Sequence, residues 1–153
     1  MTRLDHLVIR ADASSRAGTG HVMRCIALAQ HWQGSGRKVT FLSHQPGTSL
    51  RQRIASAGID LVPLEEAHPH ETDLATTCSL LQKLDSPCLA VDGYHFDSEY
   101  QQAVRQASHR LLVIDDTAHL PSYHADKLLN QNIHAQQLAY AVDDDTELLL
   151  GPR

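Results

Sequence analysis

The chain has 153 residues, enough for one domain with a sizeable core, and 42% of them are apolar. Its formal net charge is −5 and it has no basic block, which argues against nucleic acid as a partner. No apolar run reaches membrane-spanning length and none resembles a signal peptide, so we predict a cytoplasmic protein with no membrane partner. Three widely spaced cysteines favour reduced thiols.

Short β-rich runs alternate with helical stretches in the first half of the chain. After the first run, Val22, Cys25 and Ile26 recur at helical spacing, which predicts a helix with one buried face. The elements expected here are a strand over 6–11, a helix over 20–33, a strand over 38–43, a helix from a cap at Thr48 or Ser49 to Gly58, and a strand over 59–62 that Pro63 closes.

The alternation continues in the second half of the chain. The expected elements are a helix over 71–84, a strand over 88–92, a helix over 98–107, a strand over 111–115 and a short strand near 127–129, followed by a tail over 143–153 that is acidic and then apolar. Alternation of helices with continuously apolar strands predicts an α/β fold. We expect a Rossmann-like open parallel sheet with helices on both faces, in one domain over residues 1–153.

Ligands of open α/β sheets bind outside the carboxyl ends of the strands, so polar residues after each strand are the candidates for a site. In Gly18-Thr19-Gly20-His21 two glycines allow a tight turn, and the following helix offers free N–H groups to an anion such as phosphate. His21, in the first helical turn, is a candidate general base, the alternative being a histidine that only caps or packs. Met23 replaces the third glycine of G-x-G-x-x-G, and we expect no nucleotide cofactor.

Polar residues also follow the other strands. Arg10 either pairs with Asp12 or holds a phosphate or sugar oxygen. Asp92 ends a strand, where an aspartate most often bonds nearby amides, whereas Tyr94 is a candidate to bind substrate or water. For Asp115-Asp116 a structural or supporting role is the favoured interpretation.

Eleven histidines raise the question of a metal site. The best candidates are His68-Pro69-His70 and the pair His119 and His124. Neither has the i, i+4 helical spacing or the accompanying cysteines of a zinc motif. We therefore predict no bound metal.

Taken together, these segments resemble a known family. Arg10-Ala11-Asp12, Gly18-Thr19-Gly20-His21 with Arg24, and Val91-Asp92-Gly93-Tyr94-His95 are similar to motifs of the UDP-2,4-diacetamido-2,4,6-trideoxy-β-L-altropyranose hydrolases of pseudaminic acid biosynthesis. Residues 114–116, 128–132 and 149–153 extend the resemblance nearly from end to end. It implies the N-terminal half of a GT-B-like two-domain fold. It also implies metal-independent hydrolysis of the sugar–phosphate bond to UDP and free sugar.

On this resemblance His21 is the catalytic base and Tyr94 lines the substrate site. The other substrate-binding residues that it implies are Arg10, Asp12, Gly18, Gly20 and Arg24. The family's second, nucleotide-binding domain is expected to be absent from this chain, so a C-terminal domain or a partner chain would complete the site. Two alternatives stay open: a GT-B-type glycosyltransferase domain that uses a UDP-sugar donor, and a non-catalytic fragment that retains the fold.

Overall fold

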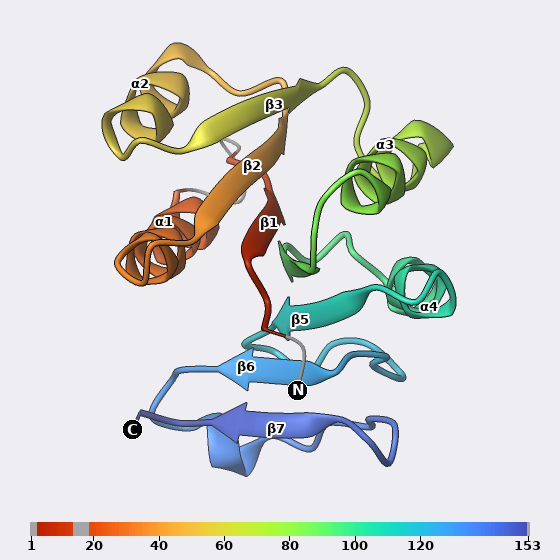
Figure 1. The fold of residues 1–153 in the computed structure, drawn as a ribbon. Coiled ribbons are helices and arrows are strands. Elements are labelled where there is room, and N and C mark those ends of the chain that lie inside the picture. Colours follow the sequence, from red (N-terminus) through yellow and green to blue (C-terminus); the bar gives the residue numbers. More distant parts are fainter. Residues whose placement is uncertain (1–2, 14–18, 153) are drawn as a thin grey trace.

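In the computed structural model, which describes residues 3–13 and 19–152, the strands form one parallel sheet in the order β3-β2-β1-β4-β5-β6-β7 (Figure 1). Along the chain the elements are β1 (His6–Ala11), α1 (Gly20–Gln33), β2 (Lys38–His44), α2 (Thr48–Ser56), β3 (Asp60–Leu64), α3 (Glu71–Gln82), β4 (Pro87–Asp92), α4 (Ser98–Gln106), β5 (Arg110–Ile114), β6 (Lys127–Asn130), the 3₁₀ helix η1 (Ala135–Gln137) and β7 (Glu147–Leu150). This is the Rossmann-like α/β architecture that the sequence predicts.

The strand order reverses between β1 and β4. β2 and β3 extend the sheet on one side of β1, whereas β4 to β7 extend it on the other side. β1 and β4 pair directly, with Ala11 opposite Asp92 at their carboxyl ends. Open α/β sheets bind ligands at such a switch point, because the segments that leave the two strands diverge and leave a crevice. The residues after β1 and β4 are therefore the first to consider for function.

Helices cover both faces of the part of the sheet that contains β1. Figure 1 shows α1 and α2 on one side and α3 and α4 on the other. We call these sides the α1 face and the α3 face. Because side chains alternate along a strand, Leu7 and Ile9 of β1 pack in the layer of α1, whereas Val8 joins the layer of α3 and α4.

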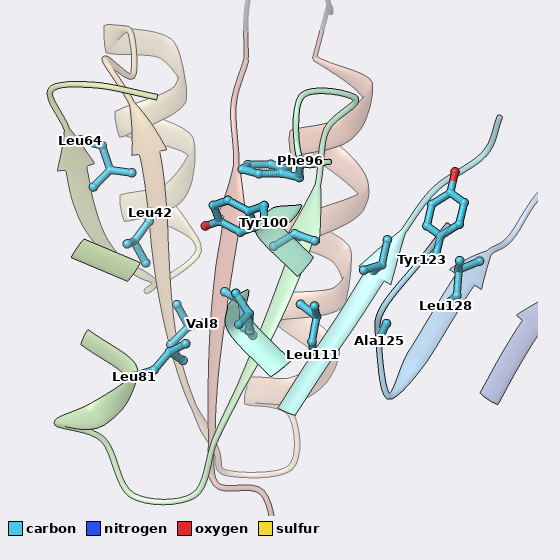
Figure 2. Packing of buried hydrophobic residues seen from close by; sticks show 14 residues of the cluster. Val8, Leu42, Leu64, Leu81, Phe96, Tyr100, Leu111, Tyr123, Ala125 and Leu128 are labelled. Atoms are coloured by element: carbon cyan, nitrogen blue, oxygen red, sulfur yellow. The ribbon is translucent and has the colours of Figure 1, made fainter. Parts of the chain in front are cut away.

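The core of the α3 face runs across most of the sheet (Figure 2). It extends from Leu81 of α3, past Tyr100 of α4, to Leu128 of β6. Phe96 and Tyr100 are among its largest buried side chains, with ring centroids 5.0 Å apart. Burying a large apolar side chain stabilises a fold by about 1.5–3 kcal/mol, so this core holds the carboxyl ends of β1 and β4 in place.

Most elements lie where the sequence predicts them, and α1 has the predicted bounds. The observed β5 begins and ends one residue earlier than predicted, and β6 ends one residue later. Gly47, and not Thr48 or Ser49, is the N-cap residue of α2. None of the helices within the described ranges is long and apolar enough to cross a membrane.

Two differences from the prediction lie at the edges of the sheet. β3 continues through Pro63 to Leu64, although Pro63 was expected to close it. Proline is tolerated because β3 is an edge strand, paired only with β2, and needs ladder hydrogen bonds on one side only. The other edge strand, β7, pairs with β6 and was not predicted, because its four residues are too few to show a strand period.

Candidate active site

His21 lies in the first turn of α1 and faces the end of β4. Its Nδ1 is 2.5 Å from Oδ1 of Asp92, the last residue of β4. Asp92 is buried, and 9% of the His21 side chain is exposed. The two residues are 71 positions apart in sequence, and they meet because β1 and β4 are neighbours at the switch point.

The Asp92 carboxylate determines which nitrogen of His21 carries hydrogen. A carboxylate only accepts, so Nδ1 of His21 carries the hydrogen and donates it to Asp92. Nε2 then presents its lone pair, and no described residue forms a hydrogen bond with this nitrogen. In such a pair the aspartate orients the ring and stabilises the imidazolium that forms when the ring takes a proton. The geometry is that of a general base with its positioning carboxylate.

Arg24, one helical turn after His21, connects Asp92 to a second carboxylate. Its Nη2 donates to Asp92 Oδ1 at 2.6 Å, and its Nε donates to Asp92 Oδ2. Its Nη1 donates to Asp116 Oδ2 at 3.3 Å. The hydrogen bond to Asp92 raises the pKa of Arg24, which stays charged. Arg24 was predicted to bind substrate. Here its N–H groups donate to carboxylates, its Nη2 also lies 3.1 Å from Nδ1 of His21, and 20% of its side chain is exposed.

Tyr94 lies against the His21 ring and is 48% exposed. The two rings meet edge to face, with centroids 5.0 Å apart. The Tyr94 hydroxyl donates to Asp116 Oδ1 at 2.8 Å, and this bond raises the pKa of Tyr94, so the hydroxyl remains a hydrogen-bond donor. The His21 cluster, as we call it, consists of His21, Arg24, Asp92, Tyr94 and Asp116. One arginine and two aspartates leave an excess negative charge beside the imidazole.

Arg10 and Asp12 belong to a separate group on the α3 face. Nε of Arg10 donates to Asp73 at 3.1 Å, and Nη1 and Nη2 donate to Asp12 at 2.5 and 2.9 Å. Asp12 also accepts from the backbone N–H of His44 at 2.7 Å, and its Oδ2 lies 3.0 Å from Nε2 of His95. We call Arg10, Asp12, Asp73 and His95 the Arg10 cluster.

The Arg10 cluster distinguishes between the two roles that the sequence allows for Arg10. Every guanidinium nitrogen of Arg10 already donates to a carboxylate, and none of its side chain is exposed. It therefore pairs with Asp12 and Asp73 and is enclosed, while its predicted contact with a substrate stays a prediction. Burial opposes ionisation of Asp12, but hydrogen bonds from His95 and Arg10 hold the pKa of Asp12 well below its usual range. Asp12 keeps 16% of its side chain exposed at the sheet edge.

Gly20 begins α1 beside this edge. A Cβ on Gly20 would meet no atom within 4 Å, so the described residues leave the space beside it unfilled. Thr19, the N-cap residue, does not use its side chain to cap the helix. A helix N-terminus of this kind suits an anion such as phosphate. Gly18, also predicted to bind substrate, lies outside the described residues.

The histidines considered for a metal site have other partners. His68, His70, His119 and His124 each contact a nearby aspartate or threonine side chain. Nε2 of His119 is also 3.1 Å from the carbonyl oxygen of Tyr94 and helps to hold that loop. Across residues 3–13 and 19–152, no group of three His, Cys, Asp or Glu side chains is placed to hold a metal ion.

A hollow of about 440 Å³ adjoins the His21 cluster. Asp116 forms part of its wall, and the segment after β6 supplies Asn132, Ile133 and Gln137. Ile133 is 74% exposed. Carboxylate, amide and apolar side chains together suit a small ligand that has hydroxyl groups and an apolar face, such as a sugar.

Sequence reasoning singled out His21 and Tyr94 but not their partners. From the pattern alone Asp92 was assigned a structural role at a strand end, and Asp116 a structural or supporting one. The structure brings both into contact with the residues that carry the predicted site. The available signal was an aspartate directly at the end of an apolar strand, but its contact with His21 depends on the strand order.

Known proteins resemble this chain in fold. No family model and no curated protein matches the sequence. Among solved structures, MurG from Acinetobacter baumannii has a TM-score of 0.62 at 14% identity, covering 90% of this chain and 44% of that protein. A glycosyltransferase from Rickettsia africae ESF-5 has a TM-score of 0.57 at 9% identity, covering 74% of this chain and 30% of that protein. The chain thus spans less than half the length of either. The likeness confirms the predicted fold class, a Rossmann-like domain of the GT-B type.

Proposed function

We propose that this chain is the base-bearing domain of an enzyme that cleaves the sugar–phosphate bond of a nucleotide sugar. The observation that carries the proposal is the His21–Asp92 pair across the switch point of the sheet. His21 takes the proton of an oxygen nucleophile as that oxygen attacks the anomeric carbon, while Asp92 stabilises the imidazolium. A positioned general base of this kind is worth about 10²–10⁴ in rate.

Water is the nucleophile in the reaction we propose. The support is the resemblance of the strand-end motifs to the UDP-2,4-diacetamido-2,4,6-trideoxy-sugar hydrolases, in which the histidine of Gly-x-Gly-His corresponds to His21. The new bond joins the water oxygen to the anomeric carbon, and the bond from that carbon to the diphosphate oxygen breaks. The electron pair leaves with UDP, the proton goes to Nε2 of His21, and free sugar is the second product.

Transfer to an acceptor hydroxyl is the second candidate, and the likeness to solved structures favours it, because one of the structures described above is named a glycosyltransferase. The same base serves both reactions, since an acceptor hydroxyl presents the same O–H group to Nε2 of His21. The two reactions differ in whether water or the acceptor alcohol occupies the space in front of the His21 ring.

Incubation of the full-length protein with the UDP-linked sugar, with and without a candidate acceptor alcohol, separates these reactions. The products are followed by ¹H NMR spectra recorded over time. Hydrolysis releases UDP and free sugar even when no acceptor is present. Transfer gives UDP only when the acceptor is present. A non-catalytic chain gives neither, and that outcome would overturn the proposal. The matched control is His31→Ala, which removes an exposed histidine from the last turn of the same helix and is expected to leave turnover unchanged.

A further inference from the structure

A second aspartate–histidine pair lies at the same sheet edge. Nε2 of His95 is 3.0 Å from Oδ2 of Asp12. Its connectivity is the reverse of the first pair: His21 follows β1 and contacts the end of β4, whereas His95 follows β4 and contacts the residue after β1. Because Ala11, the last residue of β1, stands opposite Asp92, the Cα atom of Asp12 lies within roughly 6 Å of the Cα atom of Asp92.

His95 is held in a single orientation. Its ring centroid is 4.0 Å from that of Phe96. A Cβ on Gly93 would lie 2.8 Å from the His95 ring and 3.1 Å from the Phe96 ring, so the glycine leaves room for both rings. Together with the contact to Asp12, these neighbours restrict the ring. Such fixation costs side-chain entropy that a freely solvated surface histidine keeps.

The charged side chains around His95 do not balance when its ring is neutral. Arg10 is shared between Asp12 and Asp73, so the Arg10 cluster has one excess negative charge when the ring is neutral. The other charged group on the His95 loop, Asp97, pairs with His68. A protonated His95 donates its Nε2–H to Asp12 and balances the cluster. Its Nδ1–H then remains as a donor with no hydrogen-bond partner among the described residues, on a side chain that is 34% exposed.

We propose that His95 donates its Nδ1–H to the diphosphate that leaves the sugar, an inference that rests on the proposed function. As the bond from the anomeric carbon breaks, its electron pair goes to the diphosphate oxygen, and a fixed cationic donor stabilises that charge. The two pairs then act at opposite ends of the reaction. His21 removes a proton from the nucleophile, and His95 stabilises the leaving group. Arg10 and Asp12 are positioning residues for His95.

The test compares His95→Ala with His95→Asn in the full-length protein. Alanine removes the donor, and kcat for UDP release is expected to fall about 10²-fold, as for loss of one preorganised donor. Asparagine keeps an N–H near the position of Nδ1 but does not titrate, so it should recover part of kcat. It should also abolish the decline in kcat that we expect of the wild-type protein at alkaline pH, where a histidine ring loses its proton.

The matched control is His124→Asn. His124 also pairs with an aspartate, Asp143, at 3.0 Å, but it precedes β6 and therefore lies toward the amino end of a strand. Its kcat and pH profile are expected to equal those of the wild-type protein. If His95→Ala has the same kcat and the same pH profile as the wild-type protein, the inference is overturned and the proposed function still stands.

UDP binding provides a readout that does not depend on turnover. In the wild-type protein the affinity for UDP, measured by calorimetry, is expected to fall about tenfold more between about pH 6 and pH 8 than in His95→Asn, because only histidine loses a charge in that range. If the wild-type protein releases no UDP from the UDP-sugar, the proposed function fails. The UDP measurement still decides on His95, and equal pH dependence in both proteins would overturn the inference.

Discussion

The two ion-pair clusters at the carboxyl edge of the sheet are built from the same kinds of group and differ in access to solvent. Each combines one arginine, two aspartates and a histidine. On the α3 face, Arg10 and Asp73 are fully buried and bond to each other. On the α1 face, Arg24 is partly exposed and Tyr94 stands half exposed beside His21. The two clusters therefore differ in the burial of their arginines, whereas the histidine of the Arg10 cluster is the more exposed of the two, 34% for His95 against 9% for His21.

The comparison also shows how one cluster supports the other. Asp12 connects the end of β1 to the backbone of His44 at the end of β2. Asp73 of α3 accepts a hydrogen bond from Arg10 and so joins α3 to the end of β1. The ends of β1 and β2 are thus fixed from the α3 face. The His21 cluster on the α1 face is built on the end of β4, which pairs with β1. Four predictions test this division of roles, and they follow in order of expected effect.

Asp92→Asn should have the largest effect on turnover, a decrease in kcat of about 10²–10⁴-fold. The amide of asparagine can donate to Nδ1 of His21, which moves the ring hydrogen to Nε2 and removes the acceptor. The measurement is the rate of UDP release near neutral pH. Asp60→Asn, at an exposed position that begins β3, is the control and should match the wild-type rate. A kcat for Asp92→Asn close to the wild-type value would show that the pair on the α1 face is structural only.

Arg10→Met should lower the free energy of unfolding by about 3–5 kcal/mol, because it leaves buried carboxylates without their counter-ion. Urea denaturation measures this loss. Arg24→Met is the matched variant in the more exposed cluster and should lose about 1–2 kcal/mol, because water solvates part of that site. Equal losses of stability in the two variants would remove the distinction between the clusters.

Acid should destabilise the protein in part through Asp12. Its native pKa lies below the value of a free aspartate, about 3.9, so its stabilising contribution is complete above that pH and is lost as the pH falls further. The free energy of unfolding of the wild-type protein should therefore decrease more steeply below about pH 4 than that of Asp12→Asn. Urea titrations at several pH values measure both slopes. Parallel slopes would mean that Asp12 is not held as an ion by Arg10 and His95.

Tyr94→Phe should have the smallest effect. It removes the hydroxyl that donates to Asp116 but keeps the ring against His21, and one hydrogen bond contributes about 1 kcal/mol. A decrease in kcat of about fivefold is expected. Stability should stay within about 0.5 kcal/mol, because Tyr94 is half exposed. A large loss of stability with unchanged kcat would place Tyr94 among the structural residues.

Local patterns were sufficient for the architecture and for His21. The apolar spacing of α1 and the glycines before it follow from near neighbours in the chain, so His21 could be placed at the sheet edge without knowledge of the packing. The edge strands were harder. Pro63 suggests the end of a strand because proline lacks an N–H, but that N–H is needed only in the interior of a sheet and β3 is an edge strand. β7 is too short to show a period.

The partners of the site residues could not be predicted in the same way. Arg10 meets Asp73 across 63 positions, and His21 meets Asp92 across 71. Both contacts exist because β4 returns to lie beside β1, which is a property of tertiary packing and not of any local run of residues. For the same reason the burial of Arg10 becomes visible only in the folded chain.

The most direct test of the central claim is the rate of UDP release by His21→Ala, measured together with the affinity of that variant for UDP. The account predicts that kcat falls by about 10²–10⁴-fold while UDP binds as it does to the wild-type protein, because the ring acts on the nucleophile and not on the nucleotide. Release of UDP at close to the wild-type rate would contradict the account, since the reaction would then not depend on this base.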